Sequence, residues 1–206
     1  MSKPHRPKAV VFDLGNVLLD FDYGKTVQRI KDKCHLSETD LRKVFSASPL
    51  FDKFEHGHLN PEEYFAEIQR ITGYCGPFEE FADFFGDIFT EAPAIVGWNK
   101  RLRAARLPRY ILSNTNDLSI RFIKKRFSFF NQFDGYVFSH EHRVMKPAAR
   151  IYEAIEEMSN LRGPDLFYID DREENIQGAA ARGWQTVHHV NPARTLEIAK
   201  FLGLPA

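Results

Sequence analysis

The sequence predicts an α/β fold in which a doubly wound parallel sheet carries an inserted all-helical segment. A short apolar run at residues 9–12 ends abruptly on Asp13, which suits a strand buried on both faces of a parallel sheet. After residue 93, short apolar runs alternate with helix-length segments, as expected for parallel strands joined by helices. Between these two regions the apolar spacing is helical.

The first strand carries a carboxylate at its carboxyl end, which is the edge where open α/β sheets bind ligands. Gly15 and Asn16 tolerate left-handed backbone conformations, so the chain can turn sharply after Asp13. Asp13 is therefore a candidate nucleophile or metal ligand. The alternative is an aspartate that only forms a turn.

Residues 20–92 are predicted to form a helical cap of three to five helices, with no strand between residues 23 and 92. Ser37–Asp40 resembles a capping box, and Asn60–Glu63 supplies an N-cap, a first-turn proline and an acidic third position. Gly73 ends the helix that follows. Phe78–Thr90 holds five phenylalanines that predict another buried helical face.

The α/β alternation then resumes, so residues 1–19 and 93–206 are predicted to form the α/β core. The apolar spacing and the helix signals predict helices over residues 93–106, 117–130, 147–158, 173–182 and 195–202. Strands are predicted over residues 110–112, 136–138, 166–169 and 186–187.

Composition narrows the class of partner. The 28 Lys and Arg residues balance the 28 Asp and Glu residues, so no global field points to nucleic acid or to a membrane. The basic start is not followed by an apolar stretch long enough for a signal peptide or a membrane span, which predicts a cytoplasmic protein. Cys34 and Cys75 fit no metal or redox spacing. No feature predicts an oligomeric state.

Polar residues follow several predicted strands and meet at one edge of the sheet. They are Asp13, Ser113 with Asn114, and Asp170 with Asp171, while Lys146 precedes a predicted helix. Carboxylates from two strands suit a hard cation such as Mg²⁺, and a lysine, a hydroxyl and an amide can bind phosphate oxygens. An aspartate facing them would form an aspartyl-phosphate. The alternative is that these residues have only structural roles. Ser113 and the Asp170-Asp171 pair would then cap the helices that follow them, and Lys146 would be a solvated surface residue.

These residues stand in motifs that resemble the haloacid dehalogenase superfamily of phosphohydrolases. The motifs are F-D-L-G-N-V at 12–17, I-L-S-N-T at 111–115, M-K-P-A-A-R-I-Y at 145–152 and Y-I-D-D-R-E-E-N-I at 168–176. The first and third are most similar to the branch of bacterial α-glucose-1-phosphatases and the N-terminal phosphatase domain of soluble epoxide hydrolases. The likeness includes the helical cap, through F-E-H-G-H-L-N-P-E-E-Y-F at 54–65, and spans essentially the whole chain.

The resemblance implies a Mg²⁺-dependent phosphomonoesterase that acts through an aspartyl-phosphate on a small phosphorylated metabolite, with a sugar phosphate as first candidate. It implies Asp13 as nucleophile and metal ligand, a Gly15 carbonyl on the metal, and Asp171 as the main distal carboxylate. Asp170 would be an outer or alternate ligand, supported by Asn175. Ser113 and the Asn114 amide would bind phosphate, and Lys146 would bridge phosphate and nucleophile.

One position departs from the pattern. Most phosphatases of this superfamily carry a second aspartate two residues after the nucleophile as general acid and base, and here that residue is Gly15. Either the leaving group is good enough to need less protonation, as in an anomeric or aryl phosphate, or another side chain replaces the acid. The candidate replacements are Asp20, Asp22, Glu55, His56 and His58.

Two other functions remain open from the sequence. Haloacid dehalogenases of the superfamily also lack the second aspartate, but their first motif has an aromatic residue in place of Gly15, and they need no metal. A non-catalytic binding role would use the fold as a scaffold. The presence of Asp13, Lys146 and Asp171 argues against it. A cluster of like charges is energetically costly, and an inactive site has no physical reason to keep one.

Overall fold

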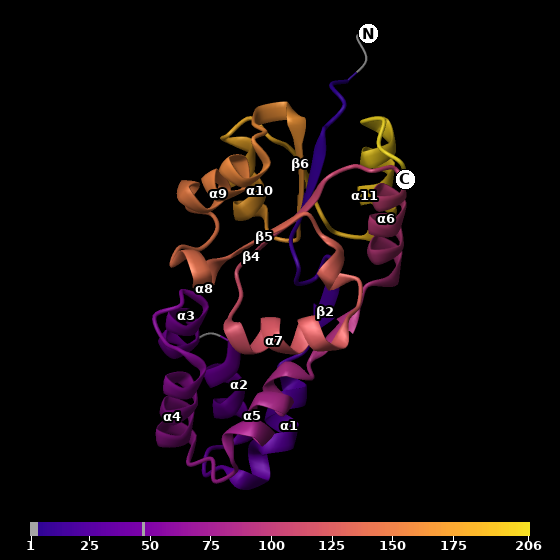
Figure 1. The fold of residues 1–206 in the computed structure, drawn as a ribbon. Helices are drawn as coiled ribbons and strands as arrows, with labels where there is room; N and C mark the ends of the chain where they lie inside the picture. The colour runs from indigo at the N-terminus through magenta and orange to yellow at the C-terminus, as the bar shows by residue number, and fades with distance from the viewer. Residues whose placement is uncertain (1–3, 47) are drawn as a thin grey trace.

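The computed structural model describes residues 4–46 and 48–206. At its centre is a parallel sheet with the strand order β5-β4-β1-β6-β7 (Figure 1). The strands are β1 (Ala9–Phe12), β4 (Arg109–Ser113), β5 (Gly135–Phe138), β6 (Leu166–Asp170) and β7 (Gln185–His188). Because all five strands run the same way, their carboxyl ends meet at one edge, and the predicted doubly wound sheet is confirmed.

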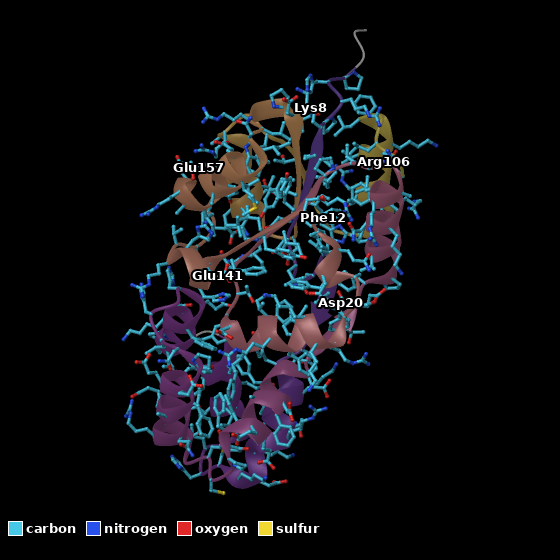
Figure 2. All side chains as sticks on the ribbon, viewed as in Figure 1. Lys8, Phe12, Asp20, Arg106, Glu141 and Glu157 are labelled. Atoms are coloured by element: carbon cyan, nitrogen blue, oxygen red, sulfur yellow. The ribbon has the colours of Figure 1, made fainter. Side chains whose placement is uncertain are left out.

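Strand β1 is buried on both faces. Val10 and Phe12 pack into one core with residues of α6 (Pro93–Ala104), α7 (Asp117–Arg126) and α11 (Pro192–Phe201). Ala9 and Val11 pack into a second core with α9 (Ala149–Ser159) and α10 (Glu173–Ala180). Figure 2 shows side chains filling the space between the sheet and the helices on both sides. Alternate residues of one apolar run thus serve two cores, which explains why the run is unbroken.

The inserted segment holds its own aromatic core. Its helices are α1 (Gly24–Ile30), the 3₁₀ turn η1 (Lys31–Lys33), α2 (Glu38–Ser46), α3 (Pro49–Glu55), α4 (Pro61–Thr72) and α5 (Phe78–Gly86). The predicted capping box at Asn60 and Glu63 is present, and Gly73 ends α4 with φ of 70°. Phe54 and Tyr64 stack with ring centroids 4.1 Å apart. Most of the phenylalanines therefore hold the cap together.

The prediction of no strand in this segment is wrong. Strands β2 (Leu19–Phe21) and β3 (Phe89–Glu91) pair antiparallel at the two places where the chain leaves and re-enters the core. The pair is three residues long on each side and joins segments about seventy residues apart, so no local periodicity marks it. The predicted helical face at Phe78–Thr90 also ends early, since α5 stops at Gly86.

Other helix boundaries also differ from the prediction, and short helical turns appear that it did not include. Helix α7 stops at Arg126, after which four phenylalanines between residues 127 and 133 turn into the core around the 3₁₀ turn η2 (Phe130–Gln132). A one-turn helix, α8 (Ser139–His142), follows β5, and α9 begins two residues after Pro147. The turn η3 (Gly163–Asp165) precedes β6. Among the described residues, no helix combines the length and apolarity needed to span a bilayer.

Candidate active site

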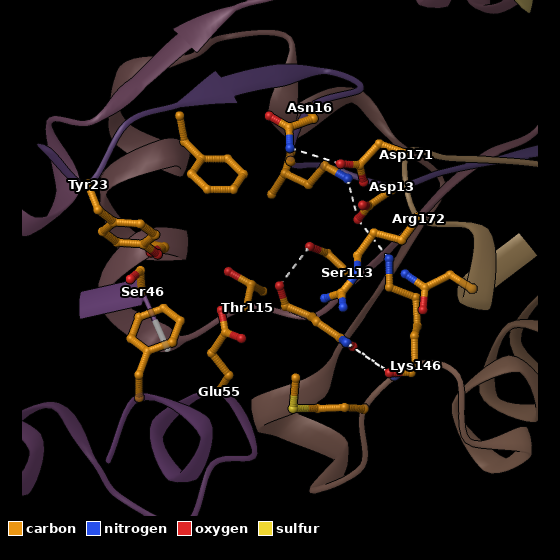
Figure 3. Close-up of a pocket in the computed structure, with 18 of the residues that line it drawn as sticks. Asp13, Asn16, Tyr23, Ser46, Glu55, Ser113, Thr115, Lys146, Asp171 and Arg172 are labelled. Carbon is orange, nitrogen blue, oxygen red and sulfur yellow. Dashed lines mark hydrogen bonds and ion pairs between the residues drawn. The ribbon is translucent and has the colours of Figure 1, made fainter. Parts of the chain in front are cut away.

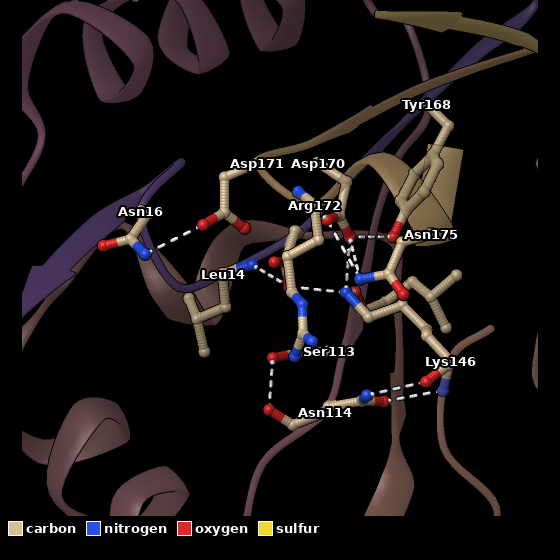
Figure 4. A network of polar contacts seen from close by, with 12 residues as sticks. Leu14, Asn16, Ser113, Asn114, Lys146, Tyr168, Asp170, Asp171, Arg172 and Asn175 are labelled. Atoms are coloured by element: carbon tan, nitrogen blue, oxygen red, sulfur yellow. Dashed lines mark hydrogen bonds and ion pairs between the residues drawn. The ribbon is translucent and has the colours of Figure 1, made fainter. Parts of the chain in front are cut away.

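The carboxyl ends of the strands bring the predicted residues together. Ser113 ends β4, Asp170 ends β6, and Asp13 follows β1, while Lys146 reaches in from the loop before α9 (Figure 4). Asp13, Ser113, Asn114, Lys146 and Asp171 all line one pocket of about 320 Å³ between the core and the cap. Residues separated by more than 150 positions in the sequence therefore face the same space.

Lys146 is held by three acceptors. Its Nζ lies 2.8 Å from Asp13 Oδ1 and 2.7 Å from Asp170 Oδ2, and it donates to the Leu112 carbonyl at 3.1 Å. The Lys146 side chain is 1% exposed, and its two carboxylate partners raise its pKa against the effect of burial. An ammonium group has three protons, so each of them already has a partner within the protein. The lysine is fixed beside Asp13 before any ligand arrives.

Asp170 is fully buried and receives donors on both oxygens. The Asn175 amide donates to both, the Arg172 backbone N–H to Oδ1, and the Tyr168 hydroxyl to Oδ2. Burial would raise the pKa of Asp170, but the Lys146 ammonium and these donors hold it below its usual value. Asp170 therefore stays charged and orients Lys146.

The pKa of Asp13 is shifted in the opposite direction from that of Asp170. Burial raises the pKa of its carboxyl to about 7, Lys146 opposes that shift, and the charges of Asp170 and Asp171 add to it. The Leu14 backbone N–H donates to Oδ1 at 2.7 Å. Lys146 contacts the same oxygen. These two contacts orient the carboxyl through Oδ1, and Asp13 lines the pocket.

Three carboxylates fit a divalent cation. Asp13, Asp170 and Asp171 each offer an oxygen within 4.8 Å of the others, and one lysine leaves two of the three negative charges uncompensated. Carboxylate oxygens are the ligands that Mg²⁺ prefers. Asp171 is partly exposed to the pocket, where Asn16 Nδ2 donates to its Oδ2 at 2.9 Å. Asp170 is already saturated with donors, so Asp13 and Asp171 are the better-placed ligands.

The predicted phosphate-binding residues lie opposite the carboxylates. The Ser113 hydroxyl makes one long contact, 3.4 Å to the Asn114 carbonyl, so it can turn toward a ligand. The Asn114 side chain exchanges two hydrogen bonds with the backbone of Lys146, at 2.8 and 3.1 Å. That amide group thus holds the lysine loop, and the Asn114 backbone is the part left for a ligand.

The cap and the β2–β3 pair supply the opposite wall, of which the sequence pointed only to Glu55. Among the phenylalanines, Phe51 of α3, Phe21 of β2 and Phe89 of β3 line the pocket. The pocket is also lined by Tyr23, Ser46, Asp52 and Glu55 of the inserted segment and by Thr115, Ser119, Met145 and Arg172 of the core. Their selection depends on helix orientation and on the β2–β3 pairing, for which the sequence carries no local signal.

The space next to Gly15 is occupied. A Cβ at this position would lie 2.8 Å from a carbon of the Phe21 ring, so a longer side chain would displace that ring. Of the five candidate replacements for the missing acid, Glu55 alone lines the pocket. Asp20 and Asp22 are exposed, and Asp22 accepts from the Gly24 N–H. The two histidines, His56 and His58, stack on each other outside the pocket.

Ser139 ties the cap to the core. Its hydroxyl accepts from the Thr115 N–H at 2.9 Å and lies 2.6 Å from the Glu55 carbonyl and 3.0 Å from the Thr115 carbonyl. Ser139→Ala is expected to cost about 1–2 kcal/mol of stability, because the Thr115 N–H and the Glu55 carbonyl lose a buried partner. Urea denaturation measures this, with Ser128→Ala at an exposed position as control, and an unchanged midpoint for Ser139→Ala would contradict it.

Comparison with known proteins supports a hydrolase. A family model described as a haloacid dehalogenase-like hydrolase matches residues 7–183. The chain is 26% identical to a D-ribitol-5-phosphate phosphatase of Bacteroides thetaiotaomicron over 90% of this chain and 93% of that protein. It is 23% identical to a sesquiterpene phosphatase of Aspergillus oryzae, over 95% and 97%. A crystal structure of a family enzyme from B. thetaiotaomicron, in complex with magnesium and inorganic phosphate, has a TM-score of 0.78 at 23% identity and covers 88% of this chain and 93% of that one.

Proposed function

Because this chain belongs to the haloacid dehalogenase-like hydrolases, we propose that it is a Mg²⁺-dependent phosphomonoesterase acting through an aspartyl-phosphate. The observation that carries the proposal is the position of Asp13. It is a buried carboxyl at the end of the central strand, it contacts Lys146, and it faces a pocket of about 320 Å³. A carboxylate that lines a pocket and is held beside the fixed Lys146 ammonium suits attack on phosphorus.

We propose roles for the remaining residues on the same grounds. Asp13, Asp171 and the Gly15 carbonyl would hold Mg²⁺, with Asp170 as an outer ligand supported by Asn175. Bound there, the cation would neutralise phosphate oxygens that otherwise repel Asp13. Ser113 and the Asn114 backbone would bind the phosphoryl oxygens. Lys146 would keep Asp13 charged and in place, and contact phosphate if one of its three protein acceptors gave way.

The substrate is proposed to be a small sugar or polyol phosphate. The pocket sets the hydroxyls of Tyr23, Ser46 and Thr115 and the carboxyls of Asp52 and Glu55 against one ligand. A leaving group rich in hydroxyls could pair with many of these groups. The relative that acts on ribitol 5-phosphate supports this class. The likeness of the first and third motifs to α-glucose-1-phosphatases adds an anomeric phosphate as a candidate.

A terpenoid phosphate is a second candidate, favoured by one observation. Phe21, Phe51, Phe89 and Met145 form an apolar part of the same pocket wall. The relative from A. oryzae is named as a sesquiterpene phosphatase. Dehalogenation is less well supported, because three carboxylates with uncompensated charge suit a cation that a halide displacement does not need.

Phosphate release tests the proposal directly. Wild-type protein is expected to hydrolyse p-nitrophenyl phosphate and at least one of D-ribitol 5-phosphate, glucose 1-phosphate, glucose 6-phosphate and farnesyl phosphate in Mg²⁺. Excess EDTA is expected to lower turnover at least ~100-fold, because removal of the cation restores the repulsion between phosphate and the carboxylates. Readdition of Mg²⁺ serves as the control. Folded protein that releases no phosphate in Mg²⁺ from any of these esters would overturn the phosphatase.

A further inference from the structure

We propose that Glu55, on the cap helix α3, is the general acid and base of this site, donating a proton to the leaving oxygen and later taking one from water. The inference rests on the proposed phosphatase activity and adds a residue to it. Transfer of phosphate from an alkyl or phenyl ester to Asp13 releases an alkoxide or phenoxide, which leaves faster when it is protonated. The site therefore needs a proton donor on the side opposite Asp13.

Glu55 is the lining group best placed for this role. Figure 3 shows its side chain pointing into the pocket from the cap, with Asp13 and Lys146 on the other side. Within residues 4–46 and 48–206, the structure gives its carboxyl no hydrogen bond and no ion pair. Its backbone carbonyl is bound by Ser139, so the residue is held to the core although it belongs to the cap. A fixed backbone with a free carboxyl suits transfer of a proton to a bound ligand.

The other lining groups fit the role less well. Lys146 already donates to three protein acceptors. Asp171 belongs to the proposed metal site, and Arg172 forms an ion pair with Glu174. Burial raises the pKa of Tyr23 far above its usual value, which makes its phenol a weak proton donor. The place of a second aspartate at Gly15 is taken by the Phe21 ring.

The surroundings of Glu55 raise the pKa of its carboxyl to near neutral pH. Burial contributes most, the charges of Asp52 and Asp13 add to it, and Lys146 and Arg172 oppose it, so the pKa of Glu55 rises to about 7. The phenols of Tyr23 and Tyr64 also lie within reach of its charge. The Tyr64 hydroxyl is buried with no hydrogen-bond partner among the described residues. A carboxylic acid that titrates near 7 can both give and accept a proton at physiological pH.

The two half-reactions balance with this residue alone. In the first, an Asp13 oxygen forms a bond to phosphorus, the bond from phosphorus to the leaving oxygen breaks, and the Glu55 proton moves to that oxygen. In the second, the Glu55 carboxylate takes a proton from a water molecule as its oxygen bonds to phosphorus, and the Asp13 oxygen leaves. Glu55 ends protonated and Asp13 ends as a carboxylate.

A pair of aryl esters tests the proposal. Phenyl phosphate has a poor leaving group that needs a proton, whereas p-nitrophenyl phosphate has a good one that does not. Glu55→Gln is expected to lower kcat/KM for phenyl phosphate by ~10²–10³-fold and for p-nitrophenyl phosphate by less than ~10-fold. With p-nitrophenyl phosphate, the variant is expected to release a burst of one nitrophenolate per enzyme and then slow down, because the second half-reaction has lost its base.

The pH profile provides an independent readout. For wild-type protein, kcat/KM with phenyl phosphate is expected to fall above about pH 7, as Glu55 loses its proton, and this decline is expected to be absent in Glu55→Gln. Since the raised pKa means that the charged carboxylate costs stability, Glu55→Gln should melt no lower than wild type at pH 8. Glu62→Gln is the matched control, because Glu62 is an exposed glutamate on the cap helix α4 that does not line the pocket.

The outcomes separate the two proposals. Equal losses on both esters without a burst, or wild-type kinetics in Glu55→Gln, would overturn the role of Glu55 while leaving the phosphatase intact. Wild-type protein that releases phosphate in Mg²⁺ from neither aryl ester nor any of the sugar, polyol and terpenoid phosphates named above would overturn the phosphatase itself.

Discussion

Asp13→Asn is expected to lower kcat/KM for phosphate esters by ~10⁴-fold or more, because the carboxamide cannot form the bond to phosphorus. Asp13 is 7% exposed at the end of the central strand, so no neighbouring carboxylate can move into its place without disturbing the sheet. Asp171 points to the same pocket but is held by Asn16. Steady-state phosphate release with p-nitrophenyl phosphate measures the loss.

Stability serves as the internal check for this variant. A neutral asparagine removes the repulsion between position 13 and the charges of Asp170 and Asp171. In metal-free buffer the melting temperature of Asp13→Asn is therefore expected to equal or exceed that of wild type. Asp20→Asn, at an exposed position on β2, is the matched control for activity. Retention of more than about a tenth of wild-type activity by folded Asp13→Asn would rule out Asp13 as the nucleophile.

Lys146→Met is expected to lower the free energy of unfolding by ~3–5 kcal/mol and to abolish turnover. The side chain of Lys146 is 1% exposed and lies between two carboxylates that are themselves 10% exposed or less. Removing the cation leaves both carboxylates without a counter-charge, and that penalty is large because both are mostly shielded from water. Turnover is lost because Asp13 no longer has the partner that holds it charged and oriented.

A second substitution distinguishes this explanation from a packing defect. Adding Asp170→Asn to Lys146→Met removes one of the two uncompensated charges, so the double variant is expected to recover part of the lost stability and none of the activity. Urea denaturation in EDTA measures both variants, with Lys200→Met on the exposed side of α11 as control. A double variant less stable than Lys146→Met would contradict the electrostatic explanation.

The core was predictable because its signals are local. A strand buried on both faces needs an unbroken apolar run, and each such run in this chain ends on a polar residue at the edge of the sheet. Helix α4 carries its own start and stop signals at Asn60 and Gly73. The convergence of Asp13, Ser113 and Asp170 then follows from topology, since parallel strands present their carboxyl ends on one edge.

Other features depended on contacts between distant segments. The β2–β3 pair joins two runs of three residues, and its register alone decides that Phe21 fills the space beside Gly15. Helix α7 stops at Arg126 because the phenylalanines after it are needed in the core. The sequence offered five candidates for the missing general acid and gave no reason to prefer one of them. The orientation of α3 decides that Glu55 faces the pocket and that His56 does not.

The sequence by itself therefore determined the α/β core, the helical insertion and the residues at the strand ends, because periodicity and capping act within a few residues of one another. Only the tertiary structure decided which cap residues meet those strand ends. It also decided the charge state of Asp13 and Glu55, since burial and neighbouring charges raise the pKa of each to about 7. Desolvation is a property of the packed molecule, and no pattern in the chain encodes it locally.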